Sequence, residues 1–163
     1  MSECYFLGDP HFGHKGITRR FRKGFSSDEE HDNYIHDQIM NCCGPNNQLW
    51  LLGDILFHPS HFRKLWEYSL SFQNVNIVLG NHDNHELVEY CIQYGIKVYG
   101  LTKRYGFWLS HAPLHSNELY GRMNVHGHVH DNTVLDDRYI NVSCEAIDYK
   151  PISLNQLRNR ISS

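Results

Sequence analysis

Residues 75–83 read VNIVLGNHD, and this stretch decides the fold of the chain. Its first five residues predict a buried strand, and a glycine followed by three polar side chains then ends that strand. Strands that end in residues able to bind metals or transfer protons are typical of α/β proteins, which carry their chemistry at the carboxyl edge of a sheet. The stretch therefore predicts an α/β fold with a functional site at a sheet edge.

Four other segments have the same form, an apolar run that ends in Asp or His. They read YFLGDPH (residues 5–11), LWLLGD (49–54), FWLSH (107–111) and VHGHVH (125–130). Five such strand ends in one short chain are hard to attribute to chance. We therefore expect their polar residues to converge on one site.

Length and composition indicate one soluble globular domain that spans residues 1–163. Hydrophobic residues make up 40% of the chain and charged residues 20%, and no repeat, linker or low-complexity segment suggests a domain boundary. The net charge of −3 argues against a general nucleic-acid-binding surface. It still allows a small phosphate-bearing substrate held by local cations.

Histidine and cysteine usage adds two expectations. The 13 histidines raise the expectation of a metal site, because imidazole is the commonest side-chain metal ligand. The 5 cysteines are odd in number and lack zinc-type spacing, so we expect reduced, mostly buried thiols. With neither a signal peptide nor a membrane-spanning apolar run, the sequence predicts a cytoplasmic protein without a membrane partner.

Periodicity predicts the order of the elements. Strands are expected at residues 3–8, 48–53, 75–79 and 96–98, and helices at about 28–42, 60–71 and 84–94. The first helix begins with a capping box at Ser27 and Glu30 and stops at residues 44–47. Beyond residue 100 short strands are expected at about 100–104, 106–110, 122–126, 133–135 and 138–143, before a helix at 153–161. His31 and His36 are predicted as surface residues of the first helix.

The residues around the first loop leave two interpretations open. Residues 18–25 form the most basic stretch, with aromatic residues interleaved, and are either a solvated connector or a rim that steers anions into the site. His14 and Lys15 face either substrate or solvent. His58, four residues after Asp54, is a further candidate for the lining of the site.

The candidate metal ligands comprise two carboxylates, one amide and four imidazoles. They are Asp9, His11, Asp54, Asn81, His111, His128 and His130. Mixed nitrogen and oxygen ligands suit Mn, Fe, Zn, Co or Ni better than Ca. The set is too large for one ion but suits two ions that share Asp54, which would leave His82 free to act as general acid.

In this order, the blocks DPH (9–11), GD (53–54), GNHD (80–83), His111 and GHVH (127–130) resemble those of the calcineurin-like metallophosphoesterase superfamily. The HFGH form of residues 11–14 and the small size are similar to the compact bacterial and phage members. The resemblance implies a four-layer αββα sandwich with two metal ions.

The resemblance also implies a role for each ligand. Asp9, His11 and His130 would hold one ion, with Asp54 as the bridge to the second. The ligands of the second ion would be Asn81, His111 and His128. His82 would protonate the leaving oxygen.

This sequence departs from the protein phosphatases of that superfamily in its second block. Those enzymes place a further Asp and an Arg there, whereas Asp54 is followed by the apolar residues 55–57 and His58. The Asp partner of His82 is therefore missing from the block, and Asp83 and His58 are the alternatives. The phosphate-clamping Arg is missing too. Its candidate replacements are Lys15, Arg19, Arg20 and Arg122.

The function implied is hydrolysis of a phosphodiester or phosphomonoester by a metal-bridging hydroxide. Diesters are favoured because the short chain has no room for a cap domain, and the substrate would be a small phosphate ester, a nucleotide or a nucleic-acid end. His14 is a further substrate contact. Mn is the favoured ion, with Fe, Zn, Ni or Mg as alternatives.

Two other functions are weighed against hydrolysis. A protein-interaction scaffold on the same fold would show damaged ligand blocks, and here the blocks are intact. A nuclease for long nucleic acids would need a basic groove or an added DNA-binding domain. The sequence leaves the oligomeric state open.

Overall fold

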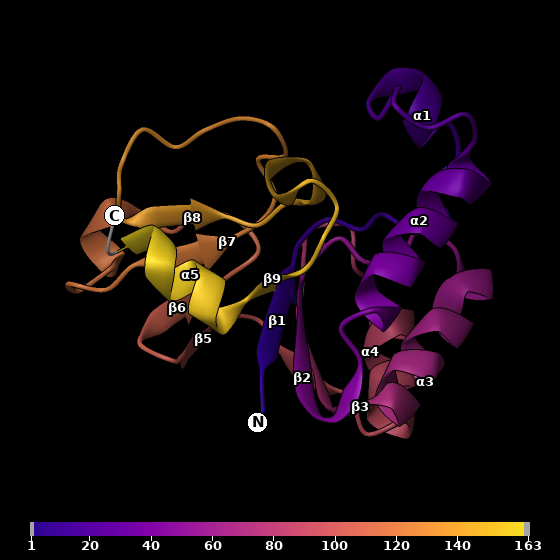
Figure 1. The fold of residues 1–163 in the computed structure, drawn as a ribbon, viewed down its shortest axis with the longest axis horizontal. Helices are drawn as coiled ribbons and strands as arrows, with labels where there is room; N and C mark the ends of the chain where they lie inside the picture. The colour runs from indigo at the N-terminus through magenta and orange to yellow at the C-terminus, as the bar shows by residue number, and fades with distance from the viewer. Residues whose placement is uncertain (1, 162–163) are drawn as a thin grey trace.

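A computed structural model describes residues 2–161 and shows a mixed α/β fold with two sheets (Figure 1). The first sheet has the strand order β4-β3-β2-β1-β9. Its strands are β1 (Cys4–Leu7), β2 (Gly44–Leu52), β3 (Phe72–Val78), β4 (Lys97–Tyr99) and β9 (Ile152–Ser153). The first four are parallel, and β9 is antiparallel to β1. The carboxyl ends of β1, β2 and β3 therefore meet at one edge.

The second sheet has the order β5-β6-β7-β8 and is also mixed. Its strands are β5 (Thr102–Arg104), β6 (Phe107–Leu109), β7 (Asn124–His126) and β8 (Tyr139–Asn141). The last three are parallel to one another. An isolated bridge joins Gly8 to Ser143, so the carboxyl ends of β1 and β8 lie together.

Helices cover the first sheet on one side, and the second sheet lies on its other side (Figure 1). The covering helices are α2 (Asp28–Met40), α3 (Phe62–Ser71) and α4 (His85–Gln93). The short α1 (Ile17–Arg20) precedes them, and α5 (Leu154–Ile161) packs against β1 and β9. None of the helices among residues 2–161 has the length and apolar character needed to cross a bilayer.

Three short 3₁₀ helices complete the chain. They are η1 (Pro59–His61), η2 (Ser116–Glu118) and η3 (Cys144–Ile147). The helix starts follow their expected capping chemistry, because the Ser27 hydroxyl accepts the Glu30 N–H at 3.0 Å. The Glu30 carboxylate, however, accepts from the N–H of Ser26, one residue earlier than a capping box requires.

The central strand β2 is buried on both faces, which explains its continuous apolar run. Trp50 stacks on Phe6 and Tyr99 with ring centroids 6.5 and 5.4 Å apart, and its indole N–H donates to the Tyr105 hydroxyl at 3.2 Å. Because side chains alternate along a strand, Leu51 points to the opposite face, where it is fully buried.

Most of the predicted elements are confirmed, including α2, α3, α4 and α5. The strand predicted at residues 133–135 is wrong, because these residues form an irregular connection and Leu135 is 97% exposed. Residues 44–47, which were predicted to end the first helix, are part of β2. Gly44 pairs with Phe72, and the register shifts before Gln48. Among the described residues all five cysteines are free, and three of them are buried.

The burial of β2 predicts that truncation of its side chains lowers the stability of the fold. Leu51→Ala should lower the free energy of unfolding by about 2–5 kcal/mol, because it removes buried methyl groups and leaves a cavity. Urea denaturation measures this loss. Leu135→Ala is the matched control, since its side chain is solvated. Equal stability of the two variants would contradict the placement of Leu51 in the core.

Candidate metal centre

Two groups of side chains at the strand ends could each hold a metal ion. One contains Asp9, His11 and His130, and the other contains Asp54, His111 and His128. Within each group the candidate ligand atoms lie within 4.8 Å of one another. The residues follow β1, β2, β6 and β7, so the two sheets contribute to the centre together.

Asp54 lies between the two groups. Its Oδ2 is 3.4 Å from His111 Nε2 and 3.7 Å from His11 Nε2, so one carboxylate faces both clusters. Burial alone would raise the pKa of Asp54, but hydrogen bonds from the His111 side chain and the His82 N–H outweigh burial and lower the pKa to about 2. Asp54 is therefore ionised at neutral pH and has the charge that a bridging ligand needs.

The second group places several acceptor atoms around one imidazole nitrogen. His111 Nδ1 donates to the Leu52 carbonyl at 2.9 Å, which leaves Nε2 facing the others. That Nε2 lies 3.0 Å from Asn81 Oδ1 and 3.1 Å from His128 Nδ1. These atoms lie at hydrogen-bond distances from one another, and nitrogen and oxygen atoms placed in this way can also coordinate one cation. Asn81 thus joins the second group.

The first group contains buried polar atoms without partners among the described residues. Asp9 is completely buried, yet its Oδ1 has no hydrogen bond, and neither has Nε2 of the buried His11. An unpaired buried carboxylate oxygen is costly. Burial also lowers the pKa of His11, which favours the neutral imidazole that binds metals. These orphaned atoms fit a divalent cation.

Five of the seven predicted ligands have left-handed backbone conformations. The φ angles are 57° at Asp9, 53° at His11, 53° at Asp54, 72° at His128 and 54° at His130. Residues with a Cβ rarely adopt this region, and they do so most often at functional sites. The chain therefore turns sharply at each strand end and directs these side chains to one place.

Two glycines allow the strand ends to approach closely. A Cβ at Gly80 would collide with the backbone nitrogen and carboxylate of Asp54. A Cβ at Gly127 would collide with the carboxylate of Asp9 and lie 3.1 Å from the Leu52 carbonyl oxygen. Glycine is thus required in the GNHD and GHVH blocks by the packing of the loops.

His82 lies at the mouth of the centre, but neither predicted partner orients its ring. Its Nε2 is 3.9 Å from Asp54 Oδ2, its side chain is 51% exposed, and its ring lies against Phe57 at a centroid distance of 4.9 Å. The Asp83 carboxylate accepts instead from the backbone N–H groups of Asp54, residue 55 and residue 80 at 2.8–2.9 Å. Asp83 therefore fixes two loops, which corrects its predicted role beside His82.

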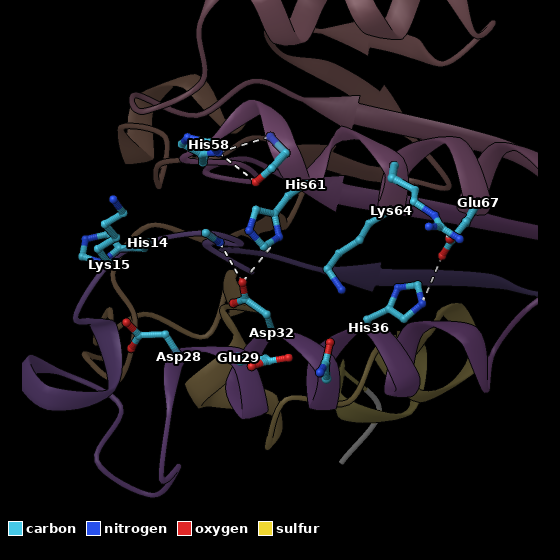
Figure 2. Close-up of a pocket in the computed structure, with 14 residues that line it drawn as sticks. His14, Lys15, Asp28, Glu29, Asp32, His36, His58, His61, Lys64 and Glu67 are labelled. Carbon is cyan, nitrogen blue, oxygen red and sulfur yellow. Dashed lines mark hydrogen bonds and ion pairs between the residues drawn. The ribbon is translucent and has the colours of Figure 1, made fainter.

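The predicted substrate contacts are divided between a groove and the protein surface. A groove of about 740 Å³ lies beside the centre, and His14 and Lys15 line one end of it (Figure 2). His58 also lines it, but its Nδ1 caps η1 through Ser60 and does not reach His82. Arg19 and Arg20 are exposed on α1.

The prediction for Arg122 is not supported by its position. Arg122 precedes the amino end of β7, whereas the ligands follow the carboxyl end of that strand. Strand direction therefore separates Arg122 from the metal centre. Its backbone N–H donates to the Leu119 carbonyl at 3.0 Å, and its side chain is exposed.

A buried ion pair behind the first group was not predicted. Arg22 Nε lies 2.7 Å from Glu145 Oε1, and the same oxygen is 3.2 Å from His130 Nδ1. Burial would raise the pKa of Glu145, but His130 and Arg22 outweigh it and lower the pKa to about 2. The carboxylate thus fixes the Nδ1 proton of His130 and leaves its Nε2 free for a metal.

Arg22 also holds the loop that carries Asp9. Its guanidinium donates to the Asp9 carbonyl at 2.6 Å, to the Pro10 carbonyl at 3.2 Å and to His31 Nε2 at 2.7 Å. The sequence left Arg22 in a stretch that is either a solvated connector or an anion-steering rim and placed His31 on a surface, but both side chains are buried. No local pattern distinguishes them, because their partners are distant in sequence.

Comparisons with known proteins show a family and a fold. No model of a known protein family matches the sequence. The uncharacterized protein MJ1445 of Methanocaldococcus jannaschii is 31% identical over 167 aligned residues, which cover 95% of this chain and 89% of that protein. The crystal structure of AQ665 from Aquifex aeolicus, a protein of unknown function, matches with a TM-score of 0.77 at 24% identity, over 98% of this chain and 99% of that one.

A weaker match is phosphopantetheinyl hydrolase (PptH) from Mycobacterium tuberculosis. Its TM-score is 0.38 at 18% identity, over 60% of this chain and 35% of that chain. A score of this size does not establish a common fold. The likeness to AQ665 shows the fold alone, because the identity is low.

The Glu145 contacts predict a selective loss of metal binding. Glu145→Gln should weaken Mn²⁺ binding at the Asp9 group by about 10–100-fold, because His130 loses the carboxylate that orients it. The Asp54 group should keep its affinity. Calorimetric titration of metal-stripped protein measures both sites, and circular dichroism checks the fold. Glu89→Gln, an exposed change on α4, is the control.

An Mn²⁺ titration of Glu145→Gln that matches the wild-type titration at both sites would contradict the orienting role. Loss of both sites together with the loss of helical signal would mean that the ion pair supports the fold as a whole.

Proposed function

The chain belongs to the family of the protein MJ1445 of Methanocaldococcus jannaschii, and we propose that it is a metal-dependent phosphoesterase of the calcineurin-like type. The observation that supports this most is the position of the ionised Asp54 between two ligand groups, with His82 beside it. The four-layer αββα arrangement of that superfamily is part of the proposal. The proposal also includes a preference of this protein for phosphodiester over phosphomonoester substrates.

The ligands support a two-ion site. Asp9, His11 and His130 would hold one ion and Asn81, His111 and His128 the other, with Asp54 shared. When bound, two divalent ions supply Lewis-acid charge to the phosphoryl oxygens and lower the pKa of a bound water. Mn²⁺ is the ion we expect, and Fe, Zn, Ni and Mg suit the same ligands.

His82 is the residue we assign to proton transfer. Its ring is half-exposed, and its Nε2 lies 3.9 Å from Asp54 Oδ2. Water supplies the new oxygen on phosphorus and releases one proton to solvent, while the ester bond to the leaving group breaks. The leaving oxygen takes a proton from His82 Nε2, which solvent then restores. Phe57 restricts the ring by packing against it.

The openness of the site supports a diester substrate. His82, Asn81 and His128 are exposed at the mouth. A second ester group on a phosphate held there would therefore extend into solvent. The scaffold alternative is less well supported, because both ligand groups and His82 are intact.

Hydrolysis of two model esters tests the proposed activity. The Mn²⁺-loaded protein should hydrolyse bis-p-nitrophenyl phosphate faster than p-nitrophenyl phosphate. His82→Ala should keep both ions and lower kcat by about 100-fold or more, because the leaving oxygen loses its proton donor. His85→Ala, an exposed histidine at the start of α4, is the matched control. Turnover of His82→Ala at the wild-type rate would make the acid assignment wrong.

Metal stoichiometry tests the bridging role of Asp54. Asp54→Ala should bind neither ion tightly, because each group loses the carboxylate that both face. Asp137→Ala, an exposed aspartate in the irregular connection before β8, should bind two ions. Metal content after gel filtration measures both. Two ions retained in Asp54→Ala would exclude the shared ligand.

A further inference from the structure

A chain of aromatic rings leads from the metal centre to the surface. The His11 ring stacks on Phe57 at a centroid distance of 4.9 Å, and Phe57 contacts His14 edge-on at 4.7 Å. His14 in turn contacts Phe21 edge-on at 6.4 Å. Flat rings therefore line the route outward from a metal ligand.

The exposure of Phe21 at the end of this route is imposed by the structure. Its side chain is 71% exposed, although large aromatic side chains gain most from burial. The backbone around it is held in place, because Asp28 accepts from the N–H of Gly16 and of Thr18, and the next residue, Arg22, is buried. Phe21 is thus presented to solvent on an anchored segment.

Three cations lie on the same segment as this ring. Lys15, Arg19 and Arg20 are exposed, and within residues 2–161 they form no ion pair. The neighbouring carboxylate of Asp28 is already engaged by backbone N–H groups. Asp28 keeps its negative charge, but the three exposed cations of this segment outnumber it, in contrast to the net charge of −3 of the whole chain. This corresponds to the anion-steering rim, with Arg22 removed from it by burial.

We propose that the segment of residues 14–21 is a binding site for the nucleobase of a phosphate ester whose phosphate lies at the metal centre. The base would stack on Phe21 and the edge of the His14 ring, as bases stack on exposed aromatic residues. Lys15, Arg19 and Arg20 would contact the charge of the ligand. This inference rests on the proposed function and names its substrate class as a nucleotide unit.

His14 places its ring beside the same site. The ring lies at the end of the groove next to Lys15 (Figure 2). Its Nδ1 is shielded from solvent, so a ligand at this end of the groove would meet the ring and not that nitrogen.

Binding of two phosphate monoesters to the Mn²⁺-loaded protein tests the site. Adenosine monophosphate should bind at least tenfold more tightly than ribose 5-phosphate, because only the first has a base. Phe21→Ala should remove most of this preference, since stacking of one base contributes roughly 5- to 150-fold. The affinity for ribose 5-phosphate should not change, and Phe21→Trp should keep the preference. Calorimetry measures each affinity.

Tyr120→Ala is the matched control. Tyr120 is 69% exposed but lies just before β7, at the end of that strand away from the metal ligands. It should leave both affinities unchanged. Equal affinities of the wild-type protein for the two monoesters would overturn the nucleobase site, as would a preference that survives Phe21→Ala.

A 5′-phosphorylated trinucleotide tests whether the base belongs to a single nucleotide or to the end of a nucleic acid. An affinity equal to that of adenosine monophosphate assigns the site to a single nucleotide. Tighter binding that is lost in Arg19→Ala assigns it to a nucleic-acid end. These measurements need no turnover, so ester hydrolysis without a base preference would leave the proposed function standing and remove only this site.

Discussion

The left-handed backbone at the strand ends is the constraint on which the rest of the structure depends. Asp9, His11, Asp54, His128 and His130 each adopt a positive φ that costs on the order of 1–3 kcal/mol. The conformations persist because backbone hydrogen bonds determine them, such as Asp9 N–H to the Gly53 carbonyl at 3.1 Å and His11 N–H to the Asp54 carbonyl at 3.0 Å. The ligands are thus held in place by the main chain.

Two charged side chains, the buried Arg22 and the partly buried Asp83, stabilise these loops. The Asp83 carboxylate collects backbone N–H groups from the loops after β2 and β3, and the Arg22 guanidinium collects backbone carbonyls from the loop after β1. The hydrogen-bond partners of each side chain are backbone groups of loops, which the ladders of helices and strands leave unpaired. A rigid support of this kind would allow a metal centre to keep its geometry while its mouth stays open to solvent.

The sequence predicted the candidate ligands because each is adjacent to a strong local pattern. An apolar strand, a turn and a polar side chain occur within a few residues, and parallel pairing then brings the strand ends together. Arg22 and Glu145 could not be predicted in this way, since 123 residues separate them. Both interpretations of the basic stretch, a solvated connector or an anion-steering rim, left Arg22 accessible, and only the tertiary structure shows its burial. The strand predicted at residues 133–135 does not form, because Leu135 meets no apolar surface.

The segment between β1 and α2 contributes both to the candidate metal centre and to the exposed surface beside it. It supplies the ligands Asp9 and His11, and it supplies Arg22, whose buried side chain returns to fix the Asp9 loop. One residue before Arg22, the same segment exposes Phe21 to solvent. Anchoring and exposure therefore alternate along a few residues. Changes at the exposed positions would leave the atoms of the candidate metal centre undisturbed. If the proposed function holds, substrate choice and metal binding are therefore separable along this segment.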